Sequence, residues 1–466
     1  SGGGDVFING KATATTGIPF GFDALGALNI NSGTGGISVS GVSAATYGIE
    51  LSNGLASGTG LSFTSAKTSG TAISISGTTT AASSYGVVFD YNSSKYVMAT
   101  GGGGINITGV GTGSFYGVFL SNTNVLSTSG AISVDGGTKG INVVNGATFG
   151  KNSATIVTTS SSNVTLAGDV VNVGAATTID TTGTLTVQPT SDSFNGTLSW
   201  PISNLSLGSS VSGLTIGKDI GTRAHSDTVM IGSNASIAGP IKVYAGNINL
   251  GAGLSSTGAS SGISLYATNN INSTASGLTV QTAGGNILFN SNVTGTGGSI
   301  DLDRMTVLSN GGNITLGGGL NGTDYAVGTA TSSMPIYGAN AKYKGVFLQG
   351  VTLNAGGVST GGNISIKGKG WQGANWNDLA SDYYALGVDM VGYTAGSTLT
   401  TNGSGSITLN GVGGINYDDT THSAGINIYN GAGITANSIN TVNGAINITG
   451  TAGSGLSRLK AGINQD

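Results

Sequence analysis

The chain has 466 residues, of which 86 are glycine, only 7% are charged and none is cysteine, and its formal net charge is -4. Average globular chains carry about 25% charged residues and about 7% glycine, yet the apolar content of 38% is too high for a disordered chain. This composition excludes disulfides, thiolate metal sites and a basic nucleic-acid surface, and the lack of an apolar run of about 18 residues excludes a membrane-spanning helix.

Two short phrases recur along the chain and define the predicted strands. The first is glycine followed by apolar, any and apolar residues, and it begins at Gly48, Gly86, Gly117, Gly345, Gly387 and Gly425. The second is isoleucine, a polar residue and an apolar residue, and it begins at Ile37, Ile73, Ile105, Ile132, Ile364, Ile407 and Ile446. Because side chains alternate between faces along a strand, both phrases predict strands with one apolar and one polar face.

The spacing of the two phrases predicts how the strands are arranged. Gly48 precedes Ile73 by 25 residues and Gly117 precedes Ile132 by 15, and the other intervals lie between these values. We interpret this interval as one coil and predict an all-β fold, a right-handed parallel β-helix (solenoid) with about 19–20 residues per coil. A propeller would carry aromatic blade signatures, and a sandwich would not repeat its sequence.

The repeats are regular in residues 1–150, less regular and rich in Thr and Ser in 151–300, and regular again in 301–466. Strands remain recognisable in the middle region, starting at Val164, Ile241, Ile248, Ile263 and Ile287. Asn-Gly pairs predict turns, since both residues tolerate positive φ, and Gly-Gly-Asn before Ile364 predicts a corner. No linker composition separates the regions, so we expect a single continuous β-helix over residues 1–466.

Several stretches resemble a known family. "SGLTIGKDIG" at 212–221, "GPIKVYAGNINLGAGLSSTG" at 239–258 and the repeated "GGNITL" and "GGNISI" are similar to the repeat regions of filamentous-haemagglutinin-like exoproteins. These are bacterial surface proteins of the two-partner-secretion type with β-helical shafts. The resemblance implies a secreted, extracellular or cell-surface adhesin or filament, active in cell adhesion or biofilm. Its partners would be other copies of itself, host or neighbouring cell surfaces, and glycans.

The residues at both ends of the sequence continue the repeat pattern and do not resemble polar caps. A solenoid without caps exposes strand edges that can pair with another chain. We therefore expect either that the parent chain continues or that copies stack end to end into fibres.

A carbohydrate-active β-helix enzyme, a polysaccharide lyase or hydrolase, is the main alternative. Such enzymes cut with acidic clusters on one face, and the candidate here is Asp301 with Asp303 in "IDLDR", which share a strand face, while Arg304 lies on the other face unless the strand ends there. The simpler interpretation is two exposed strand carboxylates. With only two histidines, roughly 200 residues apart, we predict no metal, no cofactor and no catalytic residue. A threonine-lined surface that orders water, as in ice binding, is a third possibility, but the outward positions mix Ser, Asn and Thr.

The longest interruption of the repeat, "WQGANWNDLASDYYALGVDMVGY" at 371–393, predicts a loop insertion on one face of the β-helix. Insertions in solenoids often carry the binding face, and exposed aromatic residues concentrate binding energy. The alternative is a loop whose aromatic residues pack onto the wall behind it. The candidate contact residues are Trp371, Trp376, Asp378, Asp382, Tyr383 and Tyr384.

Overall fold

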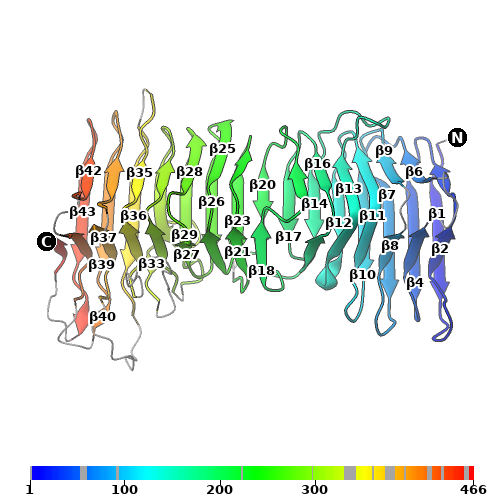
Figure 1. Cartoon of the computed structure of the whole chain (residues 1–466), viewed down its shortest axis with the longest axis horizontal. Helices are drawn as coiled ribbons and strands as arrows, with labels where there is room; N and C mark the ends of the chain where they lie inside the picture. Colours follow the sequence, from blue (N-terminus) through cyan, green and yellow to red (C-terminus); the bar gives the residue numbers. More distant parts are fainter. Residues whose placement is uncertain are drawn as a thin grey trace. The chain divides into compact units, whose positions relative to one another are not determined.

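The structure is a computed structural model, and it describes residues 3–52, 60–90, 94–221, 224–295, 297–329, 343–358, 361–372, 384–392, 395–416, 422–431, 435–455 and 461–465. It divides into two compact units, unit 1 with residues 1–195 and 202–218, and unit 2 with residues 196–201 and 219–466. Within each unit, strands of one wall follow one another in chain order along a stack (Figure 1). The helical structure in the described ranges is one 3-10 turn, η1 (Gly137–Lys139).

Unit 1 has two extended parallel walls. Wall A1 contains β1 (Val6–Ala12), β4 (Ile37–Ser43), β7 (Thr71–Thr79), β10 (Gly104–Val110), β12 (Ile132–Asp135), β14 (Val164–Ala167), β17 (Leu185–Gln188) and β20 (Leu214–Ile216). Wall B1 contains β2 (Phe22–Leu25), β5 (Ile49–Ser52), β8 (Val87–Asp90), β11 (Val118–Ser127), β13 (Ile141–Gly150), β15 (Val171–Val173), β16 (Thr177–Asp180) and β19 (Leu205–Leu207). Three further strands belong to the same sheet: β3 (Asn29–Asn31), β6 (Leu61–Ser65) and β9 (Lys95–Ala99). β3 pairs with β6, β6 pairs with β9, and β9 pairs with the second half of β11.

Unit 2 has three walls and a short strand pair, β40 (Ile415–Asn416) with β44 (Ser454–Gly455). Wall A2 contains β23 (Ile241–Ala245), β26 (Ile263–Ala267), β29 (Ile287–Ser291), β32 (Ile314–Gly318), β33 (Ala326–Val327), β36 (Ile364–Lys369), β39 (Ile407–Val412) and β43 (Ile446–Thr451). Wall B2 contains β18 (Thr197–Trp200), β21 (Thr228–Ile231), β24 (Asn247–Leu250), β27 (Ile271–Ser273), β30 (Ile300–Asp303), β34 (Val346–Gln349), β37 (Val388–Gly392), β41 (Ile426–Asn430) and β45 (Ile463–Gln465). Wall C2 contains β22 (Ala235–Ile237), β25 (Leu254–Ala259), β28 (Thr279–Ala283), β31 (Thr306–Leu308), β35 (Thr352–Asn354), β38 (Thr398–Thr400) and β42 (Ser438–Asn440).

The two sequence phrases occupy different walls, and each stacks on its own copies. In wall A1, Ile37 pairs with Ile73, which pairs with Ile105 and then Ile132, and all four are at most 2% exposed. The residues that follow them, Ser38, Ser74, Asn106 and Ser133, form the outward column beside them. This confirms an all-β parallel β-helix with an apolar column inside and a polar column outside in each unit.

The predicted coil length of 19–20 residues holds in part of the middle region, where Thr228 pairs with Asn247, but it is wrong where the two phrases are regular. Ile37 pairs with Ile73 and Ile364 with Ile407, so those coils take 36 and 43 residues, whereas the coil from Val164 to Leu185 takes 21. Both phrases lie within one coil on separate walls, so the interval of about 19 residues measures the distance between walls. Strands on every wall face the same core and share the same apolar alternation, so the pattern cannot tell which strands stack.

Asparagines form one of the predicted corners in unit 2. The side-chain amide oxygen of Asn286 accepts the N–H of Asn313, and that of Asn313 accepts the N–H of Asn363, each at 2.8 Å. The Gly-Gly-Asn corner is thus confirmed, and each coil is hydrogen-bonded to the next by a side chain as well as by its strands. The turns predicted at Asn-Gly pairs form at some pairs and not at others. Asn310 has a positive φ of 50°, as in a turn, whereas Asn410 lies within strand β39.

Candidate contact surfaces

The predicted contact loop at 371–393 is described only at its two ends. The Trp371 N–H donates to the Tyr343 carbonyl at 2.9 Å, and the two rings lie 5.1 Å apart against buried Ala385. Tyr384 stacks at a tilt on His422 with ring centroids 4.6 Å apart. The described aromatic residues therefore pack onto neighbouring coils, as the alternative interpretation predicted. Four predicted contact residues lie outside the described residues: Trp376, Asp378, Asp382 and Tyr383.

The acidic pair considered for catalysis is buried, so the expectation of exposed strand carboxylates is wrong. Asp301 and Asp303 are each 0% exposed, and Ser299 Oγ donates to Asp301 Oδ2 at 3.0 Å. Arg304 was expected on the opposite face unless the strand ends there, and β30 does end at Asp303, so that Arg304 takes φ 42°. Its Nε and Nη2 donate to Asp303 Oδ2 at 3.2 and 3.1 Å. Carboxylates enclosed in this way cannot contact a polysaccharide.

A buried ion pair lies on the same outward face of wall B2. Lys344 Nζ is 2.7 Å from Asp389 Oδ2, and the two side chains are 5% and 1% exposed. Lys344 also sits over the Phe347 ring at 4.5 Å, and Asn427 Nδ2 donates to Asp389 Oδ1 at 2.8 Å. Phe347, Asp389 and Asn427 occupy one column of the wall, so this face is held by a continuous polar network rather than left open.

Partly exposed aromatic side chains run along unit 1 in a column that we call the aromatic strip: Phe20, Tyr47, Tyr85, Phe115 and Phe119. Ring centroids are 5.7 Å apart for Phe20 and Tyr47, and 5.5 Å for Tyr47 and Tyr85. Tyr85 then contacts Phe115 at 4.6 Å and Phe119 at 5.2 Å. The rings meet at tilted or edge-to-face angles, the arrangements that aromatic pairs prefer. Four of these residues lie in the corners that lead into wall B1 and Phe119 lies in β11, so the strip presents aromatic surface on four successive coils.

The aromatic strip was not predicted from the sequence, although an aromatic residue stands directly before the glycine with which the first phrase begins. The letters "FGF" at 20–22, "YGI" at 47–49, "YGV" at 85–87 and "YGV" at 116–118 place an aromatic residue, a glycine and an apolar strand residue in each coil. Since Ile49 pairs with Val87 and Val87 with Val118, equivalent positions stack. In the first three coils the aromatic residue before the glycine therefore approaches its copies, whereas in the fourth coil Phe115 and Phe119, not Tyr116, contact Tyr85.

The glycine of this motif is required by the close approach of walls A1 and B1. A Cβ on Gly86 would lie 2.7 Å from both the Gly109 carbonyl carbon and the Gly117 oxygen, and closer still to the Val110 nitrogen. Real Cβ atoms do not approach backbone atoms this closely. Gly48 and Gly117 face backbone atoms in the same way. The corner therefore fixes where each aromatic residue leaves the wall.

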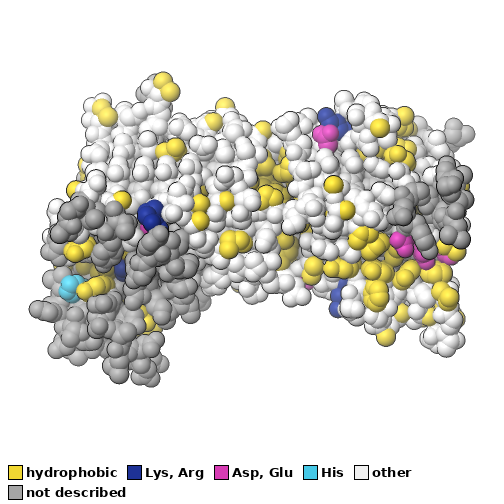
Figure 2. Space-filling view, viewed as in Figure 1, with side chains coloured by type: hydrophobic (Ala, Val, Ile, Leu, Met, Phe, Trp, Pro, Cys, Tyr) yellow, Lys and Arg dark blue, Asp and Glu magenta, His cyan; other side chains and the backbone are white. Residues whose placement is uncertain are grey.

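Three carboxylates lie beside the aromatic strip on wall B1. Asp23 pairs with Glu50 in register, and Asp90 ends the strand of the next coil. Figure 2 shows acidic side chains along the edge of a band of hydrophobic side chains in unit 1. Glu50 is only 7% exposed, and Asp23 Oδ1 is buried without a hydrogen-bond partner in the described part of the chain. The aromatic strip is thus bordered by carboxylates that are largely withdrawn from water.

Burial dominates the electrostatics of this cluster. Desolvation, followed by the charges of Asp23 and Asp90, raises the pKa of Glu50 from 4.5 to about 7. Desolvation also raises the pKa of Asp23 and, with smaller contributions from Tyr47 and Asp90, that of Tyr85. Lys95 lies inside the coil with Nζ donating to the Ser121 carbonyl at 2.9 Å. Its desolvation lowers its pKa to about 8, although Asp90 raises it.

We expect unit 1 to lose stability as the pH rises from about 5 to 8. Because the folded state raises the pKa of Glu50 from 4.5 to about 7, folding favours the protonated carboxyl. Its stabilisation is complete below pH 4.5 and is lost as the pH passes 7, a change on the order of 2 kcal/mol. Lys95, with a pKa of about 8, titrates at the upper end of this window, where its lowered pKa acts in the opposite direction. Urea unfolding at pH 5 and pH 8, followed by amide exchange in β5, should show the loss in the wild type and little in Glu50→Gln. Equal pH dependence in both proteins would contradict this assignment.

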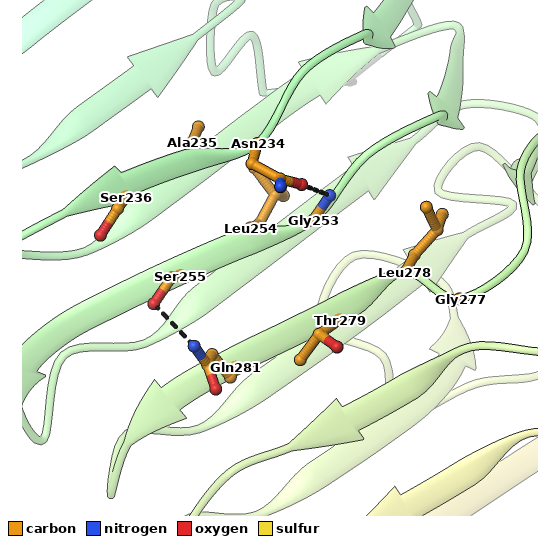
Figure 3. Close-up of a pocket in the computed structure, with 10 residues that line it drawn as sticks. All are labelled: Asn234, Ala235, Ser236, Gly253, Leu254, Ser255, Gly277, Leu278, Thr279 and Gln281. Atoms are coloured by element: carbon orange, nitrogen blue, oxygen red, sulfur yellow. Dashed lines mark hydrogen bonds between the residues drawn. The ribbon is translucent and has the colours of Figure 1, made fainter.

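Unit 2 carries an open groove of about 300 Å³ on wall C2, formed across β22, β25 and β28 (Figure 3). Asn234 Oδ1 accepts the Gly253 N–H at 2.7 Å, and Gln281 Nε2 donates to Ser255 Oγ at 3.3 Å. The lining has no titratable side chain, so the groove offers no acid–base or metal chemistry. Its residues are Asn234, Ala235, Ser236, Gly253, Leu254, Ser255, Gly277, Leu278, Thr279 and Gln281.

Outward threonines continue along wall C2 in one column, Thr279, Thr306, Thr352 and Thr398. The parallel column two residues on carries Gln281, Leu308, Asn354 and Thr400. This mixture agrees with the expectation that the outward positions are too irregular for a surface that orders water.

Within the described ranges, no three or more His, Asp or Glu side chains gather in a way that could hold a metal ion. In the same part of the chain, no helix is long and apolar enough to cross a membrane. Comparison with protein-family models, with curated proteins and with solved structures found no match to this chain.

Proposed function

We propose that this chain is a non-enzymatic structural and adhesive β-helix of a bacterial extracellular surface protein or filament. The observation that carries the proposal is the aromatic strip, which places partly exposed rings on four successive coils. Binding energy at protein surfaces concentrates in such aromatic side chains, and the glycine corners between walls A1 and B1 fix the positions from which they project. The stacked walls supply the scaffold, and the aromatic strip supplies the contact.

Two further observations support this proposal over the carbohydrate-active alternative. The acidic pair on which that alternative depended, Asp301 and Asp303, is enclosed and 0% exposed. The groove on wall C2 lacks titratable groups. The family resemblance supports a secreted, cell-surface location, with partners among cell surfaces, glycans or other copies of the chain. The loop at 371–393 stays a predicted second contact.

Beads coated with the full chain should be retained under flow on layers of animal cells or of bacterial cells. We expect Tyr47→Ser with Tyr85→Ser to reduce retention at least tenfold, because the double variant removes the centre of the aromatic strip. Tyr266→Ser is the matched control, since Tyr266 stacks on Tyr244 at 4.9 Å in wall A2 of unit 2 and is not part of the strip. Beads that adhere to neither layer, or that adhere equally well with the double variant, would refute the proposed function.

A further inference from the structure

We propose that the aromatic strip and the carboxylates beside it form a binding site for an uncharged glycan chain that runs along the stack of coils. This inference rests on the proposed adhesive function and names the ligand class of the same surface. It draws on the spacing of the rings, the carboxylates at their edge and the sign of the charge.

The spacing of the rings matches a ligand built of repeating ring-sized units. Successive aromatic centroids are 5.7, 5.5 and 4.6 Å apart from Phe20 to Phe115, about one coil spacing per step. A sugar ring has an apolar face of C–H groups that packs on an aromatic side chain. A glycan laid along the strip therefore meets a new aromatic residue roughly once per sugar, and the contacts add along the chain.

The carboxylates supply the polar contacts that orient a sugar. Glu50 is 7% exposed, whereas Asp23 is partly exposed beside the rings. A carboxylate at the edge of the aromatic strip can accept a hydroxyl hydrogen from a sugar that lies on the rings. Binding sites that combine apolar surface with a few fixed polar groups are typical for small molecules and sugars.

The charge of the cluster selects against other ligands. Asp23 and Asp90 place negative charge beside Glu50, so an acidic glycan would meet like charge at this site and is disfavoured. A second copy docking through the same surface would place the same acids opposite each other, since a two-fold contact repeats one patch on both partners. An uncharged glycan avoids both penalties while donating hydroxyl hydrogens to the acceptors.

Titration calorimetry of the full chain with linear hexasaccharides tests the proposal. The probes are uncharged cellohexaose, maltohexaose and xylohexaose, anionic hexagalacturonate and a cationic glucosamine hexamer. We expect at least one uncharged hexamer to bind and hexagalacturonate not to bind. Affinity should fall at least tenfold in Tyr47→Ser with Tyr85→Ser. It should stay within threefold in the matched Tyr47→Phe with Tyr85→Phe pair and in Tyr266→Ser.

If Tyr47→Ser with Tyr85→Ser weakens the fold, amide exchange of the wild-type chain still tests where the hexamer binds. A saturating hexamer should protect amides around residues 47–50 and 85–88, and protection confined to other walls would overturn the proposal. Binding of the cationic hexamer alone, or of none of the uncharged probes, would overturn it as well. If strip-dependent adhesion of beads persists without hexamer binding, the glycan assignment fails while the adhesive function stands. If the wild-type chain shows no strip-dependent adhesion of beads, the proposed function itself is refuted.

Discussion

Gly86→Ala should destabilise unit 1 by about 3 kcal/mol, the upper end of the usual penalty for overpacking. The new methyl group would lie 2.7 Å from the Gly109 carbonyl carbon and the Gly117 oxygen, which belong to the backbones of two walls. Flexible side chains can move aside, but these atoms are fixed by the strand pairing on both sides. The walls must therefore separate at this corner, which breaks hydrogen bonds in the neighbouring coils.

Gly26→Ala is the matched control for this substitution. Gly26 follows β2 in the same unit, a Cβ added to it would meet no atom within 4 Å, and its φ lies outside the left-handed region. Alanine there should change stability by no more than about 0.5 kcal/mol. Urea unfolding followed by far-ultraviolet circular dichroism, with amide exchange in β5 and β8, compares the two variants. If their midpoints agree, the close approach of walls A1 and B1 is not what selects glycine.

Asp389→Asn should cost unit 2 about 3–5 kcal/mol, the typical effect of removing one partner of a buried ion pair. The substitution keeps the size of the side chain but leaves the Lys344 ammonium buried without the carboxylate 2.7 Å away. The Phe347 ring below Lys344 offsets only part of this loss, since a cation–π contact is worth about 2 kcal/mol when desolvated. The polar column that includes Asn427 loses its charged acceptor at the same time.

The double variant Lys344→Met with Asp389→Leu separates the cost of an orphaned charge from the value of the pair. Replacing a buried pair by apolar residues of similar volume is often neutral or stabilising, so much of the lost stability should return. Tryptophan fluorescence during urea unfolding reports on this unit, because all three tryptophans, Trp200, Trp371 and Trp376, fall within its residue ranges. A double variant as unstable as Asp389→Asn would show that packing, rather than charge, dominates at this site.

The repeated phrases were sufficient to predict the strands and the face that each side chain takes, but not which strands stack. Ile73 and Ile105 pair in register because both stand at the same point of the same phrase. Alternation along a strand is a local property, so about six residues suffice to show which side chains face the core. The coil length could not be predicted, because strands on every wall have the same sequence pattern. Only the long-range pairing shows that Ile37 stacks on Ile73, 36 residues later in the chain.

The candidate sites, too, could be predicted from the sequence only in part. The aromatic residue before each glycine is visible in the letters "YGI" and "YGV", but its role depends on coils that bring Tyr47 and Tyr85 to within 5.5 Å. Asp301 and Asp303 look like solvated strand residues in the sequence, and only the packed structure encloses them. The sequence by itself determined the strands and the face each side chain takes, since both follow from local alternation. The tertiary structure alone decided which coils stack, where glycine is required and which polar groups are buried, since these depend on residues distant in the chain.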